Sequence, residues 1–180
     1  MKNAIILTSE SSLQIARTIQ SELEKTVIFT KADIEGTIQI SSISGCISDI
    51  FDKVESILFI GAMGICVRSI APYIKDKHTD PAIVNIDSTG KYVISVLSGH
   101  VGGANDLTQR IAHILGAEVI ITTQSDNTNL WALDILGEKY GWTTTSNTAD
   151  FNEPLITFVN KKTTALLLDI NDEGTQYLER

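Results

Sequence analysis

Short apolar runs alternate with segments of helical character along the first 140 residues. The runs are rich in Ile, Val, Leu and Phe and predict strands at 3–8, 27–29, 56–60, 82–86, 92–97 and 118–122. The segments between them predict helices over 11–23, 46–54 and 104–115, and the first and last of these carry apolar residues at helical spacing. This alternation is typical of βα units around a mostly parallel sheet. We therefore expect a three-layer α/β fold with helices on both faces of the sheet.

One pair of runs and the last third of the chain depart from this pattern. Only the turn residues Asp87-Ser-Thr-Gly90 separate the runs at 82–86 and 92–97, which predicts an antiparallel hairpin. Residues 34–43 suit either an edge strand or a loop. The last third is helix-like at 130–140 and β-like at 142–145 and 165–170. We expect an α/β core domain over 1–127 and a small α/β appendage over 128–180.

Composition limits the class of protein and its partners. The 180 residues are 43% apolar and 20% charged, as in an ordinary globular chain. A net charge of -8 opposes binding to nucleic acid and to anionic lipid surfaces. No apolar run approaches the roughly 20 residues of a membrane span. Cys46 and Cys66 are too few for a disulfide framework. We expect a cytoplasmic protein that binds neither nucleic acid nor membrane.

Loops that follow predicted strands are the candidate sites. The ligand crevice of an open α/β sheet lies outside the carboxyl ends of the strands, which favours the loops at 61–64, 98–105 and 122–127. Gly61 and Gly64 would let backbone amides approach an anion at a helix N-terminus, with Arg68 one turn further on. The same glycines also suit a simple strand-to-helix turn, and the arginine also suits an exposed helix face.

The most unusual string in the chain is Ser98-Gly-His-Val-Gly-Gly103. Its glycines indicate close backbone approach, and His100 suits a general base because imidazole titrates near neutral pH. The Gly102 and Gly103 amides would face a developing oxyanion. Ser98 is not expected to be an acyl-enzyme nucleophile, because the flanking glycines of a nucleophile elbow are absent. A structural histidine bonded to backbone is the alternative.

A second polar string, Lys77-His-Thr-Asp80, adds a cation, an imidazole and a carboxylate. His78 and Asp80 could join His100 in a two-histidine, one-carboxylate metal set, but the spacing matches no tight zinc pattern. We therefore predict no metal site. Either Asp80 or His78 is expected to orient His100 or to serve as the alternate base.

Four strings resemble the cobalamin biosynthesis protein CbiG family. They are Gly61-Ala-Met-Gly-Ile-Cys-Val-Arg-Ser-Ile-Ala-Pro72, Asp76-Lys-His-Thr-Asp-Pro81, Ser95-Val-Leu-Ser-Gly-His-Val-Gly-Gly-Ala-Asn105 and Val119-Ile-Ile-Thr-Thr123. The resemblance is dense over 56–127, and the stretch from 130 to 170 looks like the variable middle segment of the family. It implies a cobalt-precorrin-5A hydrolase of cobalamin (vitamin B12) biosynthesis, which opens the δ-lactone of a cobalt corrinoid and expels acetaldehyde.

The chemistry of that reaction suggests a role for each candidate residue. His100 is the predicted base, and Asp80 or His78 its orienter or alternate. Arg68 and Lys77 would hold carboxylate side chains of the corrinoid. The other predicted substrate-binding residues are Gly61, Gly64, Ser98, Gly99, Gly102, Gly103 and Asn105. The substrate brings its own cobalt, so no protein metal or cofactor is expected.

The resemblance also bears on partners. Longer members of the family carry a further C-terminal domain, whereas this chain ends at Arg180. We expect a separate polypeptide with that domain, or a second copy of this chain, to close over the loop at 98–105. Two alternatives stay open: a noncatalytic corrinoid-binding subunit, and an unrelated α/β domain whose glycines bind an anion.

Overall fold

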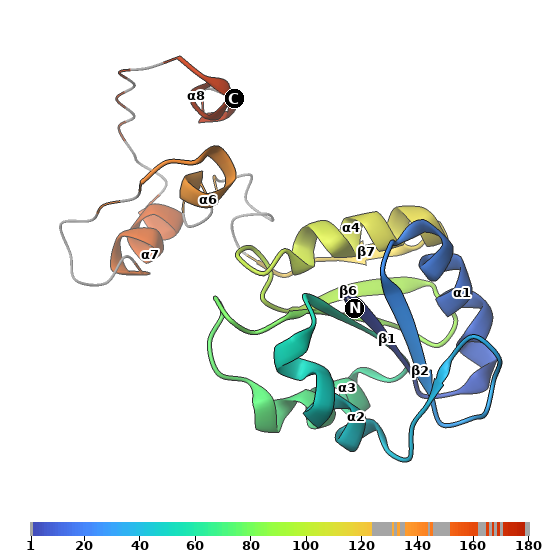
Figure 1. Cartoon of the computed structure of the whole chain (residues 1–180). Helices are drawn as coiled ribbons and strands as arrows, with labels where there is room; N and C mark the ends of the chain where they lie inside the picture. Colours follow the sequence, from blue (N-terminus) through green and yellow to red (C-terminus); the bar gives the residue numbers. More distant parts are fainter. Residues whose placement is uncertain are drawn as a thin grey trace. The chain divides into compact units, whose positions relative to one another are not determined.

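The computed structural model describes residues 2–123, 131, 133, 136–143, 145, 152–161, 165, 167, 169 and 171–178. The chain forms two compact units, Met1–Ile121 and Thr122–Arg180, which are coloured blue to yellow and orange to red in Figure 1. No helix within the described residues has the length and apolar character needed to cross a membrane.

The first unit is built on a seven-stranded sheet in the order β3-β2-β1-β4-β5-β6-β7. Its strands are β1 (Asn3–Leu7), β2 (Thr26–Thr30), β3 (Ile38–Gln39), β4 (Ser56–Ile60), β5 (Ala82–Ile86), β6 (Tyr92–Leu97) and β7 (Glu118–Ile120). Strands β1 to β5 are parallel, β6 is antiparallel to β5, and β7 is parallel to β6. The predicted mostly parallel sheet and the predicted hairpin are both confirmed.

Helices cover both faces of this sheet (Figure 1), as predicted. The helices of the first unit are α1 (Leu13–Glu22), α2 (Ile43–Ile50), α3 (Met63–Ile70) and α4 (Ala104–Leu115). Short 3-10 turns at Glu10–Ser12, Phe51–Lys53 and Ala71–Tyr73 extend three of them. Helices α1 and α4 pack on one face, and α2 and α3 pack on the other. The result is a three-layer unit with a hydrophobic cluster on each side of the sheet.

The central strand β4 supplies both clusters. All five of its residues are buried. Alternate side chains of a strand point to opposite faces, so Leu58 and Ile60 join the cluster under α1 and α4. Ile57 and Phe59 join the cluster under α2 and α3. Burying each such side chain contributes about 1.5–3 kcal/mol, which explains why a continuous apolar run forms this strand.

One prediction about an element needs correction, and one open alternative is decided. The run at 118–122 was expected to be a buried strand, but β7 is short and Val119 is 45% exposed. The reason is its place at the end of the sheet, where β6 is its single neighbouring strand. Residues 34–43 contain the two-residue edge strand β3.

The second unit is described by three helices, α6 (Leu136–Tyr140), α7 (Asn152–Lys161) and α8 (Glu173–Leu178). The first lies within the helix expected over 130–140, and the sequence patterns did not predict the other two. The β-like stretches at 142–145 and 165–170 fall partly outside the described residues, and the described residues in them belong to no strand.

Candidate active site

The direction of β6 decides which candidate loops can meet. We call the edge where β1, β4 and β5 begin the amino edge, and the edge where they end the carboxyl edge. Leu97, the last residue of β6, is paired with Ile83 near the start of β5. The loop at 98–105 therefore starts from the amino edge, whereas Gly61 follows the end of β4 at the carboxyl edge.

We assigned both of these loops to the ligand crevice at the carboxyl ends of the strands, and for the loop at 98–105 this assignment is wrong. The five residues of β4 span about 13 Å at the usual rise per residue, and this length separates the two edges. Loops that follow the carboxyl ends of strands lie at the same edge of the sheet only when those strands are parallel. The hairpin between β5 and β6 reverses one of them.

The loop at 98–105 instead meets the predicted site loop at 77–80, at the amino edge. The Ser98 hydroxyl donates a hydrogen bond of 3.1 Å to the backbone carbonyl of Asp80. Both residues are buried, at 8% and 5% exposure. Only Pro81 separates Asp80 from the start of β5, and Ser98 is the first residue after β6. The loop carrying Lys77 and His78 and the loop carrying His100 are therefore joined through a buried contact.

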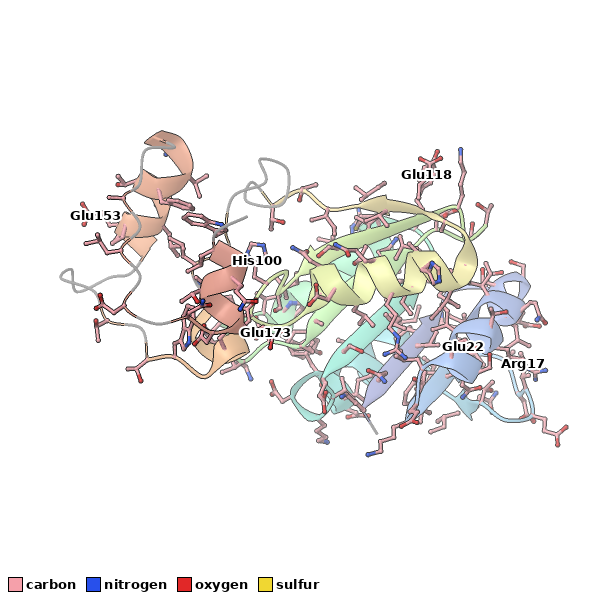
Figure 2. All side chains as sticks on the ribbon, turned by 90° about the horizontal axis from the view of Figure 1, so that it is seen from above. Arg17, Glu22, His100, Glu118, Glu153 and Glu173 are labelled. Carbon is pink, nitrogen blue, oxygen red and sulfur yellow. The ribbon has the colours of Figure 1, made fainter. Side chains whose placement is uncertain are left out.

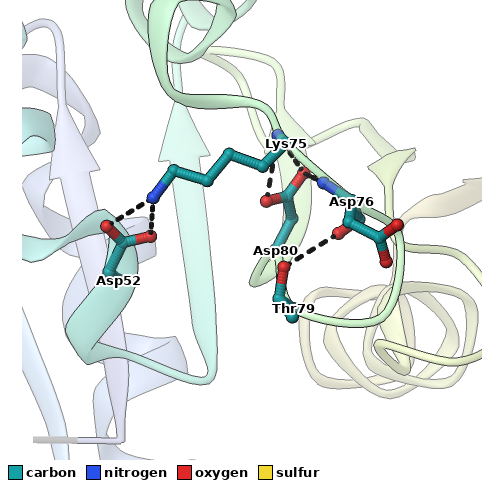
Figure 3. Close-up of polar contacts among 5 residues, drawn as sticks. All are labelled: Asp52, Lys75, Asp76, Thr79 and Asp80. Carbon is teal, nitrogen blue, oxygen red and sulfur yellow. Dashed lines mark hydrogen bonds and ion pairs between the residues drawn. The ribbon is translucent and has the colours of Figure 1, made fainter.

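The Asp80 carboxylate closes its own loop (Figure 3). It accepts the backbone N–H of Lys75 at 2.9 and 3.2 Å and the N–H of Asp76 at 3.1 Å. The Lys75 ammonium extends the other way and pairs with Asp52 at 2.8 Å. The Thr79 hydroxyl donates to the Asp76 carbonyl at 3.5 Å. Both oxygens of the buried carboxylate thus hold backbone amides, which favours His78, exposed on this loop, over Asp80 as the second acid-base group.

The glycines of the loop at 98–105 are explained by how tightly it folds on itself. A Cβ atom at Gly102 would lie 2.3 Å from Ser98 Cβ, and one at Gly99 would lie 2.9 Å from Asn105 Oδ1. The N–H of Asn105 donates to the Gly99 carbonyl at 2.9 Å. The predicted close approach of the backbone is thus confirmed, but the atoms that Gly99 and Gly102 approach belong to the same loop.

The same folding changes the roles predicted for two residues of this loop. The N–H of Gly103 donates to the His100 carbonyl at 3.0 Å, so it is not available to an oxyanion. That part of the prediction is wrong. Asn105 is buried, and its Oδ1 accepts the Ser95 hydroxyl at 2.6 Å. Asn105 therefore supports the loop from inside. The sequence patterns missed Ser95 because nothing in the run at 92–97 marks it as a loop support.

His100 itself is half-buried in the middle of this loop. Figure 2 shows its imidazole beyond the N-terminal end of α4. The position fits a group that acts on a ligand at the amino edge.

A cleft of about 550 Å³ opens at this edge, next to the His100 loop. Gly102 and Gly103 form part of its wall. The remaining lining comes from the starts of the strands and from the facing ends of α1 and α4: Lys2, Asn3, Glu22, Leu23, Glu24, Lys25, Glu55, Ser56, Ala82, Asp106, Leu107 and Arg110. Three cationic side chains face four carboxylates, and Lys2 is already paired with Glu55 at 3.0 Å. The wall therefore has no excess of positive charge.

Lys25 and Arg110 belong to this wall but were not among the predicted site residues. Arg110 lies here because the reversed β6 brings the start of α4 to the amino edge, and Lys25 lies here because it directly precedes β2, which is parallel to β1. Arg110 donates to the Glu22 carbonyl at 2.9 Å and thereby ties α4 to the end of α1.

The predicted residues of the carboxyl edge form a separate group. Gly61 has φ +153°, and a Cβ atom there would lie 2.2 Å from the Thr8 hydroxyl oxygen. The amide of Asn85 donates to the Gly61 carbonyl at 3.1 Å. Arg68 lies on an exposed face of α3 and donates to the Gly64 carbonyl at 3.4 Å. This geometry agrees with the alternative reading, a strand-to-helix turn that needs glycine at Gly61.

The two cysteines do not offer nucleophiles. Burial raises the pKa of the Cys66 thiol to about 12. Burial, and then the charge of Asp49, raises the pKa of Cys46 to about 11. Thiols in this range are protonated at neutral pH and unreactive. Among the described residues, no group of three or more His, Cys, Asp or Glu side chains could hold a metal ion.

Comparison with known proteins shows where this chain belongs. Residues 45–126 match the family model for the cobalamin synthesis G N-terminal region, and residues 131–180 match the model for the cobalamin biosynthesis central region. The first match contains the predicted site loops at 61–64, 77–80 and 98–105, and all but the last residue of the candidate loop at 122–127.

Curated relatives carry one shared name. A cobalt-precorrin-5A hydrolase from Priestia megaterium is 40% identical over 147 residues, which cover 77% of this chain and 39% of that protein. The protein of the same name from Salmonella typhimurium is 52% identical over 86 residues, which cover 48% of this chain and 24% of that protein. The chain therefore spans well under half the length of these relatives.

A solved structure agrees with the fold. A cobalamin biosynthesis protein G homolog from Sulfolobus solfataricus superimposes with a TM-score of 0.56 at 25% identity, covering 96% of this chain and 52% of that one. The two family models lie in consecutive order along the chain and together take in most of it. The protein therefore belongs to the cobalamin biosynthesis protein G family, whose N-terminal and central regions it carries.

Proposed function

We propose that this protein takes part in hydrolysis of the δ-lactone of cobalt-precorrin-5A, with release of acetaldehyde. The choice of substrate is supported by the relatives described above, which are named cobalt-precorrin-5A hydrolase. The observation that carries the proposal is the buried Ser98–Asp80 contact, which joins the loop of His78 to the loop of His100, and Gly102 and Gly103 of the latter loop line an open cleft. These loops hold the imidazoles that hydrolysis of an ester bond calls for.

The chemistry begins with water at the lactone carbonyl. His100 accepts the proton of the attacking water, and the Gly102 amide at the cleft wall donates to the developing oxyanion. Ring opening gives a carboxylate and a free hydroxyl on the bridging carbon. That hydroxyl then loses its proton, and the bond from the bridging carbon to the macrocycle breaks. The electron pair passes into the conjugated macrocycle, and the two-carbon unit leaves as acetaldehyde.

Binding of the substrate carboxylates is assigned to the amino edge. Lys77 lies on the loop joined to Ser98 and is proposed to hold one of them. Arg68, Gly61 and Gly64 lie at the opposite edge of the sheet, so we do not assign them to the part of the corrinoid near His100. The cobalt enters with the substrate, and no protein cofactor is proposed.

The test is the variant His100→Ala. Loss of a general base lowers turnover by roughly 10²–10⁴-fold, and corrinoid binding is expected to stay within a few-fold of the wild type. Acetaldehyde release measures the first quantity and absorbance titration of the corrinoid the second. His113→Ala is the matched control, because His113 is exposed at the far end of α4. An unchanged turnover in His100→Ala would exclude His100 as the base.

We also propose that a second polypeptide or a second copy of the chain completes the site. The cleft wall carries three cations against four carboxylates, which gives little attraction for a polycarboxylate. Turnover per chain is then expected to rise with chain concentration, or when the region that longer relatives have outside the match is added separately. Full turnover of a dilute monomer without stimulation would contradict this.

The same assays of corrinoid binding and acetaldehyde release distinguish the two alternative functions from the proposed hydrolysis. A noncatalytic corrinoid-binding subunit would bind a cobalt corrinoid and release no acetaldehyde under any of these conditions. An unrelated anion-binding domain would bind a nucleotide in preference to a corrinoid.

A further inference from the structure

Ser98 has an unusual backbone conformation. Its φ of +58° lies in the left-handed region, which is energetically unfavourable for a residue with a side chain. Lys25, with φ +55°, is the other non-glycine residue with positive φ in the described part of the chain. Lys25 lines the amino-edge cleft, and Ser98 begins the loop whose glycines line it. Backbone strain of this kind persists where surrounding contacts hold it, and it is concentrated at functional sites.

Contacts on three sides hold Ser98 in this conformation. Its hydroxyl donates to the Asp80 carbonyl at 3.1 Å, and its own carbonyl accepts the N–H of Ala104 at 3.1 Å. The backbone of Gly102 packs directly against its Cβ. The hydroxyl is thus engaged in a buried bond, and the substrate-binding role expected for Ser98 does not fit this geometry.

A glycine would adopt this conformation without strain. The hydrogen bond of the serine hydroxyl therefore offsets the energetic cost of the left-handed backbone conformation. Through its bond to the Asp80 carbonyl, this hydroxyl holds the loop at 75–80. Asp80 is fixed in turn to the amides of Lys75 and Asp76 by its carboxylate. Ser98 therefore fixes Asp80, and Asp80 in turn fixes the segment that carries Lys77 and His78.

We propose that Ser98 is a positioning residue that sets the loop of Lys77 and His78 against the loop of His100. This role rests on the proposed hydrolysis. Small displacements of reacting groups cost large factors in rate, so a loosened loop lowers turnover even when the fold is intact.

Two variants of Ser98 separate positioning from folding. Ser98→Ala loses the hydroxyl and keeps the backbone strain, so its thermal midpoint falls. Ser98→Gly loses the hydroxyl but relieves the strain, so its midpoint stays close to that of the wild type. In both variants kcat for acetaldehyde release is expected to fall about tenfold, while KM changes by less than about twofold.

Ser69→Ala is the matched control. Its hydroxyl also donates one hydrogen bond to a backbone carbonyl, that of Ile65 at 2.8 Å, but it lies on α3. Its kcat is expected to equal that of the wild type. A wild-type kcat in Ser98→Gly would overturn the proposal, because the hydroxyl would then serve folding alone.

Amide hydrogen exchange on the full chain without substrate gives a readout independent of activity. In Ser98→Gly the amides of Lys75 and Asp76 are expected to exchange about fivefold faster, the factor for loss of one hydrogen bond. Unchanged exchange would also overturn the proposal. If the wild type releases no acetaldehyde even at high chain concentration and with the region of longer relatives added separately, the proposed function fails, and the exchange result alone decides whether Ser98 joins the two loops.

Discussion

Gly61 is required to be glycine by one neighbouring side chain. A Cβ atom there would lie 2.2 Å from Thr8 Oγ1 and 2.6 Å from Thr8 Cγ2. Its φ of +153° is also one that side chains rarely adopt. The Thr8 hydroxyl donates to the Ile60 carbonyl at 3.0 Å, which fixes the threonine against the glycine. This pair joins the ends of β1 and β4, where the order of the strands reverses direction along the sheet.

We predict that Gly61→Ala lowers the free energy of unfolding by about 1–3 kcal/mol, the usual cost of an overpacked site. Urea denaturation measures it. Adding Thr8→Ala removes two of the three close contacts, so the double variant should regain part of the loss. Simple additivity of the two changes would show that the contact with Thr8 is not the cause.

At the scale of elements, the hairpin between β5 and β6 is held by Asp87. Its carboxylate accepts the N–H of Tyr92 at 2.7 Å, the N–H of Thr89 at 2.9 Å and the Thr89 hydroxyl. Partial burial raises the pKa of this carboxyl, but the hydrogen bonds from Thr89, Tyr92 and Lys91 together outweigh it. The pKa of Asp87 therefore lies below its ordinary value.

This lowered pKa makes the hairpin sensitive to acid. A carboxyl whose pKa is lower in the folded state stabilises the fold above its unfolded pKa of about 4, and this contribution disappears as pH falls through the folded pKa. Asp87→Ala is expected to lower Tm at pH 7, with a difference from the wild type that shrinks steadily below about pH 4. Asp33→Ala, which removes an exposed carboxylate elsewhere, is the control. A difference independent of pH would contradict the assignment.

Elements with a strong local pattern could be predicted from the sequence. The run at 56–60 forms β4 with the predicted bounds because the four apolar side chains that follow Ser56 are buried on both faces of the sheet. Gly116 ends α4 in a left-handed conformation, as glycine after a helix predicts. The turn at Asp87–Gly90 predicted the reversal of β6.

The arrangement of the candidate site could be predicted only in part. The meeting of the loops at 75–80 and 98–105 was expected, but the separation of Gly61 from His100 was not, although it follows from the hairpin. The roles of Asp80 and Gly103 depend on the hydrogen bonds that each residue makes within its own loop. Such bonds follow from loop conformation, which has no periodic signal in a sequence.

At the scale of the whole molecule, the two hydrophobic clusters belong to the first unit alone. Their members run from Ala4 to Ala117, and none of the described residues of the second unit belongs to either cluster. Within the described part of the chain, the buried members of both clusters therefore come from the first unit.

We predict that a fragment of residues 1–121 folds without the second unit. It should unfold cooperatively, with a Tm within a few degrees of the corresponding transition in the full chain, because it keeps every described member of both hydrophobic clusters. Circular dichroism and thermal unfolding measure this, with the full chain as control. A broad, noncooperative transition would show that residues 122–180 are needed for folding.

The reversal of β6 also makes the two ends of the sheet energetically independent. Arg68 and the Gly61 turn lie at one end, and Ser98 and His100 lie at the other, with the length of β4 between them. Effects of substitutions on stability usually add when the sites lie more than about 7–10 Å apart and share no partners. Sequence changes at the carboxyl edge therefore reach the imidazoles only through the shared strands β4 and β5, and each end of the sheet can diverge without a compensating change at the other.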